Sequence, residues 1–89
     1  MKSDLTPLLT PEAVRMLRIE RALRRHATVN LLDLMVIAGE VSVATLKRDL
    51  QCMRHVLGAT IVYRVGKGYS LYGTWAGVRA AVAAELERA

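Results

Sequence analysis

Apolar and polar positions follow two different periods along the chain. Over residues 11–26 and again over residues 43–57, apolar side chains recur every three or four positions, which is the spacing of a helix with one buried face. Over residues 59–65 and 69–72, β-branched and aromatic residues are concentrated as in strands. The pattern therefore predicts helices followed by a β-hairpin.

Each expected helix follows a residue suited to cap its N-terminus. The expected helices span residues 11–26 after Thr10, residues 31–38 after Asn30, residues 43–57 after Ser42 and residues 75–88 after Thr74. Glycines follow the second and third of these segments, at positions 39 and 58, where a helix commonly ends. Gly66-Lys67-Gly68 separates the two strand-like runs and is expected to form a turn. The chain is therefore expected to be a small α+β domain.

Length and composition fit one compact unit. The 89 residues suffice for a single core, and 53% hydrophobic with 24% charged residues is typical of a packed protein. We expect an N-terminal arm over residues 1–10, a folded domain over residues 11–73 and a further helix over residues 74–89. A lone cysteine, Cys52, forms no internal disulfide, and no apolar run has the length of a leader or membrane span, so a cytoplasmic location is expected.

Positive charge is unevenly distributed along the chain. The net charge is +5, and the excess lies in residues 12–26 and 40–68, whereas residues 74–89 are neutral. A polyanionic partner such as nucleic acid accounts for this distribution, although a basic surface can also serve solubility alone. Charge by itself therefore favours nucleic acid only modestly.

Two segments resemble the DNA-binding domains of one group of bacterial regulators. The segment VSVATLKRDL, residues 41–50, resembles the recognition-helix signature of DeoR-type and WYL-type regulators through Ser42, Thr45, Arg48, Asp49 and Leu50. The segment GATIVYRVGKGYSL, residues 58–71, is similar to the wing of the same families through Gly68, Tyr69 and Leu71. The resemblance covers residues 12–72 and implies a winged helix-turn-helix that binds double-stranded DNA. Those regulators usually continue into a ligand-sensing domain, so an effector-binding role is not carried over.

The third expected helix carries the candidate base-reading residues. If its leucine stripe faces the core, Lys47, Arg48 and Gln51 project from the opposite side, where they can hydrogen-bond to base edges. The neighbouring candidates for DNA contact are Val43 and Ala44 at the first turn, Arg54 further along, and Ser42 and Thr45, whose hydroxyls suit a phosphate oxygen. For Ser42 the role of helix cap ranks above DNA contact.

Further phosphate contacts are expected outside this helix. Lys67, between two glycines, is expected beside a minor groove or phosphate row, with Arg64 supporting it. Thr28 and Asn30 can contribute at the start of the second helix. Asp49 is expected to pair within the protein with a neighbouring arginine, because phosphate repels it. One arginine-rich face of the first helix is interpreted as solvated surface and consists of Arg18, Arg21 and Arg25.

The last expected helix has an apolar stripe with two interpretations. The stripe consists of Trp75, Val78, Val82 and Leu86. It can pair two chains, or it can fold back on its own domain. A dimer is expected because one small domain reads too few bases to discriminate well.

These observations lead to one hypothesis and one alternative. The hypothesis is a stand-alone dimeric transcription regulator, with repression favoured because so short a chain offers little surface to recruit polymerase. We expect no enzymatic activity, cofactor or small-molecule effector, and Cys52 with His55 supplies too few ligands for a metal. The alternative is a winged-helix module that binds an acidic protein partner.

Overall fold

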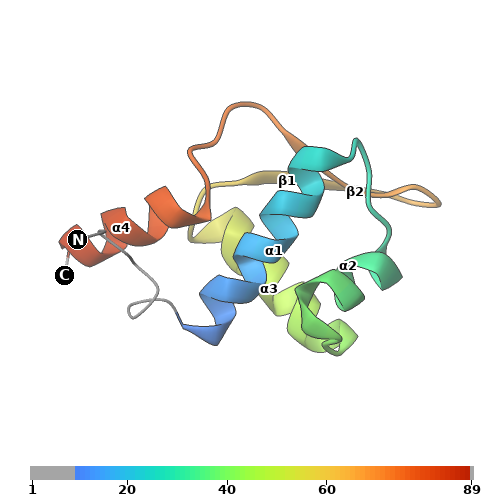
Figure 1. The fold of residues 1–89 in the computed structure, drawn as a ribbon. Helices are drawn as coiled ribbons and strands as arrows, with labels where there is room; N and C mark the ends of the chain where they lie inside the picture. Colours follow the sequence, from blue (N-terminus) through green and yellow to red (C-terminus); the bar gives the residue numbers. More distant parts are fainter. Residues whose placement is uncertain (1–9, 89) are drawn as a thin grey trace.

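The chain folds into four helices and one two-stranded antiparallel sheet over residues 10–88, the range that the computed structural model describes, with only the backbone described at Glu85, Leu86 and Arg88. The elements are α1 (Pro11–Arg25), α2 (Leu31–Gly39), α3 (Val43–His55), β1 (Thr60–Arg64), β2 (Gly68–Tyr72) and α4 (Val78–Arg88) (Figure 1). The expected α+β class is confirmed, whereas the expected arm over residues 1–10 lies, apart from Thr10, outside the described residues. None of the helices in the described range has the length and apolar character needed to cross a bilayer.

Side-chain caps start the first three helices where the sequence predicts them. The capping bonds run from Ala13 N to Thr10 Oγ1 at 3.1 Å, from Asp33 N to Asn30 Oδ1 at 2.8 Å and from Thr45 N to Ser42 Oγ at 3.1 Å. Each bond satisfies a backbone N–H that the first turn of a helix leaves without a partner. These local bonds fix where the chain enters each helix.

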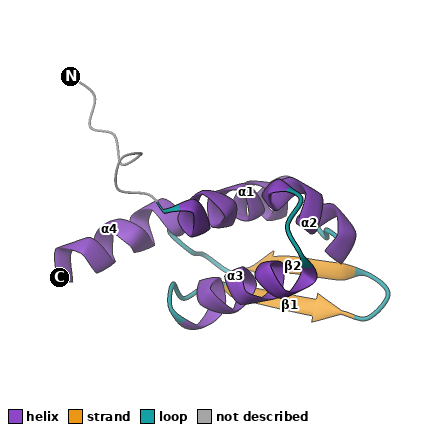
Figure 2. Ribbon diagram, turned by 90° about the horizontal axis from the view of Figure 1, so that it is seen from below, coloured by secondary structure: helices purple, strands orange, loops and turns teal. Residues whose placement is uncertain are grey.

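The core lies between α1 on one side and α3 with the hairpin on the other (Figure 2). Its fully buried side chains are Ile19 from α1, Leu34 from α2, Leu46, Leu50 and Met53 from α3, and Val78 from α4. Because α1 and α3 turn their apolar stripes toward this shared core, their polar faces are directed away from each other. The domain therefore has two polar helical surfaces on opposite sides.

An ion pair crosses the core between these two helices. Arg15 of α1 donates from Nε to Oδ2 of Asp49 at 2.6 Å and from Nη2 to Oδ1 at 3.1 Å. Asp49 is only 3% exposed, so both carboxylate oxygens find their partners inside the protein. The hydrogen bonds to Asp49 raise the pKa of Arg15 above its ordinary value. The expectation that Asp49 pairs with an arginine of the protein is confirmed, but the partner, Arg15, lies 34 residues away in the sequence.

The hairpin is held against the helices through β2. Its register pairs Thr60 with Tyr72 and Arg64 with Gly68. Val29, before α2, forms an isolated bridge with Tyr69, through bonds of 2.9 Å and 2.8 Å between their backbones. Gly68 has a φ of 124°, and a Cβ there would lie 2.5 Å from the carbonyl oxygen of Val29. Only glycine fits this close approach of two backbones.

The last helix begins later than the sequence predicts. The expected cap Thr74 and first residue Trp75 are wrong, because α4 starts at Val78. The reason is that Trp75 anchors the preceding loop, donating from Nε1 to the carbonyl oxygen of Leu57 at 2.8 Å. The N–H of Val78 is instead accepted by Oε1 of Glu20 in α1 at 2.9 Å. A carboxylate from another helix thus takes the place of a local cap.

Candidate nucleic-acid interface

The solvent side of α3 presents the three candidate base readers. Lys47, Arg48 and Gln51 are exposed, while the leucine stripe of the same helix is buried. Val43, 39% exposed, and Ala44 lie on the surface at the first turn. None of the side-chain hydrogen bonds or ion pairs found among the described residues engages the three polar side chains. The donors and acceptors of this face are therefore available to a ligand.

A hollow of about 350 Å³ lies between α3 and the hairpin. Its polar and aromatic lining comes from Lys47, Gln51 and Arg54 of α3 and from Tyr63 and Tyr69 of the hairpin. The two tyrosine rings contact each other, with their centres 4.8 Å apart. The structure therefore brings Lys47 and Gln51 together with the hairpin, whereas Arg48 lies outside the lining of the hollow.

Arg54 borders this hollow but is engaged within the chain. Its Nε donates to the carbonyl oxygen of Ile61 at 2.8 Å, and its guanidinium carbon lies 5.9 Å from the centre of the Tyr69 ring. Both contacts tie α3 to the hairpin. The main role of Arg54 is thus to connect α3 with the hairpin, the two elements that form the hollow.

The hydroxyl and amide candidates also have partners in the chain. Ser42 accepts from Thr45 N and donates from Oγ to Oγ1 of Thr45 at 3.1 Å. Asn30 caps α2, and Oγ1 of Thr28 lies 3.1 Å from Oγ of Ser70 in β2. These bonds order the starts of α2 and α3, where free backbone N–H groups suit an anion.

The turn of the hairpin projects beyond the helices (Figures 1 and 2). The turn is closed by a bond of 3.0 Å from Lys67 N to the carbonyl oxygen of Arg64. Lys67 is exposed, and Val65 beside it is 89% exposed. The guanidinium of Arg64 lies 5.8 Å from the centre of the Tyr72 ring, which supports the strand. Lys67 is therefore an exposed cation on the projecting turn.

Cys52 on α3 is a packed thiol. It is half-buried, and this burial, together with the negative charge of Asp49, raises the pKa of the thiol above its ordinary value. The thiol therefore stays protonated at neutral pH, and thiolate reactivity is low. Among the described residues, no three His, Cys, Asp or Glu side chains are grouped so that they could hold a metal ion.

The residues proposed for dimerisation do not share one exposed surface. Val78 is fully buried, and Trp75 and Val82 are half-buried against the core of their own domain. The side chain of Leu86 lies outside the described part of the chain. The beginning of the stripe thus packs on its own domain, and pairing through the remainder of α4 stays a prediction.

Two features of the interface go beyond the sequence-based expectations. Tyr63, half-exposed, lines the hollow, whereas the sequence predicts only that it lies in the strand over residues 59–65. Arg15 orders α3 through Asp49 from 34 residues away. The spacing of Tyr63 and Tyr69 on either side of the turn is the one sequence signal that could have predicted the contact between their rings. No sequence signal identifies Arg15 as the partner of Asp49.

Comparison with family models, with curated proteins and with solved structures finds no match to this chain. The small fold of helices and a two-stranded hairpin is compatible with a winged helix. The interface is therefore interpreted from its own residues.

Proposed function

We propose that this chain is a sequence-specific regulator of transcription that binds double-stranded DNA as a winged helix-turn-helix, similar to the DeoR-type and WYL-type regulators. The observation that carries the proposal is the solvent face of α3. Its lysine, arginine and glutamine are free of partners among the described residues, while its opposite face is anchored in the core.

The chemistry of this face suits the major groove. The groove admits one α-helix, and its base edges offer acceptors to Lys47 and Arg48 and a donor–acceptor pair to Gln51. In the proposed complex, Lys67 on the projecting turn contacts an adjacent minor groove or phosphate row. Free N–H groups at the starts of α2 and α3 contact the backbone of the duplex and set the register.

Assembly as a dimer belongs to the same proposal. One domain of this size contacts few bases, and two copies on an inverted repeat double the sequence that is read. Repression is the favoured outcome, since binding across a promoter needs no further surface. The selected DNA sites should then contain two half-sites related by a dyad.

The test is selection of preferred sequences from a random duplex pool, followed by affinity measurements on single variants. Arg48→Ala is expected to relax the preference at one base position and to lose about 1–3 kcal/mol of binding. Lys67→Ala should weaken all sequences equally and reduce the salt dependence by about one phosphate contact. Lys47→Ala should resemble Arg48→Ala at a different base position.

Arg21→Ala is the matched control, because it removes one exposed arginine from the other side of the domain. It should leave the selected sequence and the affinity unchanged. If no sequence is enriched, and the three variants of α3 and the turn bind like the original chain, the proposal is wrong.

A further inference from the structure

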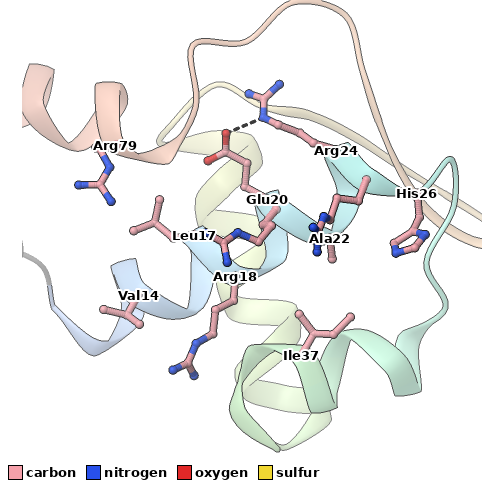
Figure 3. Close-up of a pocket in the computed structure, with 11 residues that line it drawn as sticks. Val14, Leu17, Arg18, Glu20, Ala22, Arg24, His26, Ile37 and Arg79 are labelled. Carbon is pink, nitrogen blue, oxygen red and sulfur yellow. Dashed lines mark hydrogen bonds and ion pairs between the residues drawn. The ribbon is translucent and has the colours of Figure 1, made fainter.

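A second basic surface lies on α1, in an open groove of about 910 Å³ bordered by α2 and α4. Its apolar floor is formed by Val14 and Leu17 of α1 and by Ile37 of α2, which is 37% exposed. In Figure 3 the guanidinium groups of Arg18 and Arg79 lie on either side of Val14 and Leu17. We call this surface the α1 groove.

The positive charge of the α1 groove is largely uncompensated. Five arginines line it, and the one acidic side chain of the lining is Glu20. Glu20 is bound to Arg24 at 2.7 Å and to the N–H of Val78 at 2.9 Å, so its charge is already used. Among the described side chains, no carboxylate forms an ion pair with the remaining arginines, which are Arg18, Arg21, Arg25 and Arg79.

DNA bound to α3 cannot account for these arginines. Figure 2 shows α1 on one side of the core and α3 with the hairpin on the other, and the exposed residues of both helices lie opposite the stripes that they bury in this core. A duplex along α3 and the hairpin therefore meets one side of the domain, while the α1 groove opens on the other. A ligand of the α1 groove would therefore be different from the DNA proposed at α3.

The floor of the α1 groove decides which class of ligand fits. Apolar side chains between guanidinium groups match an acidic amphipathic helix, whose apolar stripe is flanked by carboxylate side chains. A nucleic acid would set charged phosphates over the apolar floor, and the one aromatic ring of the lining is that of His26, with no Phe, Tyr or Trp on which further bases could stack. The combination therefore favours a peptide over a nucleic acid.

We propose that the α1 groove binds an acidic amphipathic helix of a partner protein, with leucine-like side chains on Val14 and Leu17 and carboxylates on the surrounding arginines. Arg21 and Arg25 are one helical turn apart and can each bind a carboxylate in bidentate fashion. Binding at this groove leaves α3 free. The domain then links its α3 ligand to a second protein.

The probe is a fluorescent 18-residue synthetic peptide with leucine at helical spacing along one face and glutamate at the positions that flank this face. The full chain should bind it by fluorescence anisotropy, with affinity that falls as salt rises. Two matched peptides complete the set, one with every glutamate changed to glutamine and one with every leucine changed to serine. Both should bind at least about tenfold more weakly, because the groove requires charge and apolar contact together.

Charge reversal separates the two surfaces. The double variant Arg21→Glu, Arg25→Glu should lose peptide binding by at least about tenfold and keep its thermal melting curve, since both side chains are exposed. Lys47→Glu, Arg48→Glu on α3 should leave peptide binding unchanged within about twofold. This comparison tests the groove even if α3 turns out not to bind DNA.

Three results would overturn the proposal. One is equal binding of the leucine and serine peptides, which would leave only unspecific attraction between charges. Another is equal loss of peptide binding in both double variants. The third is loss of binding to random duplex DNA in the Arg21→Glu, Arg25→Glu variant with no loss of peptide binding, which would make the groove a nucleic-acid surface.

Discussion

The two basic surfaces of this domain both carry positive charge, but different side chains lie between the charges. On α3, Lys47 and Arg48 stand on a helix beside a hollow edged by tyrosines and Gln51. In the α1 groove, arginines surround aliphatic side chains. The difference shows that charge alone does not identify a ligand, because the side chains between the charges decide what can lie against them.

The two surfaces also differ in how they are held in place. The α3 surface depends on contacts to the hairpin through Arg54 and on the bridge between Val29 and Tyr69. The α1 groove depends on the attachment of α4 at Glu20. The ion pair between Arg15 and Asp49 bears on both, since it joins the two helices. A substitution in the ion pair should therefore affect both surfaces. A substitution at the bridge to the hairpin should affect only the α3 surface, and one at Glu20 only the α1 groove.

The largest effect is expected for Arg15→Ala. The change leaves the carboxylate of Asp49, 3% exposed, without its two hydrogen bonds. We expect a loss of about 3 kcal/mol in the free energy of unfolding, measured by urea denaturation. Both surfaces should weaken together as the domain becomes unstable.

Arg21→Ala is the control for this change, since it removes an exposed arginine from the same helix and should cost less than about 0.5 kcal/mol. The double variant Arg15→Ala, Asp49→Ala should recover part of the loss, because no uncompensated charge remains. Equal stability of Arg15→Ala and Arg21→Ala would show that the ion pair contributes nothing.

A smaller effect, confined to the α3 surface, is expected for Gly68→Ala. The new Cβ would meet the backbone of Val29 at 2.5 Å and of Asn30 at 2.8 Å, and backbone atoms cannot move aside cheaply. We expect a loss of about 2 kcal/mol in urea denaturation, with weaker DNA binding and unchanged peptide binding at a temperature where the domain is folded.

Gly66→Ala provides the comparison for Gly68. Gly66 has a φ of 78°, but a Cβ added there would meet open space. The alanine variant should therefore lose only about 1 kcal/mol of stability, from backbone strain. If the two alanine variants are equally stable, the close approach to Val29 does not matter for the fold.

The smallest effect is expected for Glu20→Gln, which acts on the α1 groove. Glutamine keeps an oxygen that can accept the N–H of Val78 but loses the charge that faces Arg24 and the start of α4. We expect a loss of about 1 kcal/mol and weaker peptide binding, with DNA binding unchanged.

Glu87→Gln makes the same chemical change at an exposed position of α4 and should alter stability by less than about 0.5 kcal/mol. A Glu20→Gln variant with full stability and full peptide affinity would mean that the carboxylate does not hold α4 in place.

Features fixed by neighbours in sequence could be predicted. Thr10, Asn30 and Ser42 cap their helices through bonds to residues three positions away, so the starts of α1, α2 and α3 are readable from short segments. The same holds for the inward leucines and outward Lys47 and Arg48 of α3, which follow from helical periodicity.

Features that depend on contacts between distant segments could not be predicted from the sequence. The start of α4 depends on Glu20, 58 residues before Val78, and on the bond from Trp75 to Leu57. A threonine followed by a tryptophan looks locally like a capped helix, and tertiary contacts override that preference. The α1 groove is likewise invisible in sequence, since Ile37 and Arg79 reach it from α2 and α4.

Trp75 gives the molecule a built-in optical reporter. It is the only tryptophan of the chain, and its indole sits where the end of α3 meets the loop before α4. The guanidinium of Arg24 lies 6.0 Å from the centre of its ring. Tryptophan fluorescence therefore reports on this one contact between Trp75 and Leu57. We expect a shift of its emission maximum when α4 detaches, even while the rest of the domain stays folded.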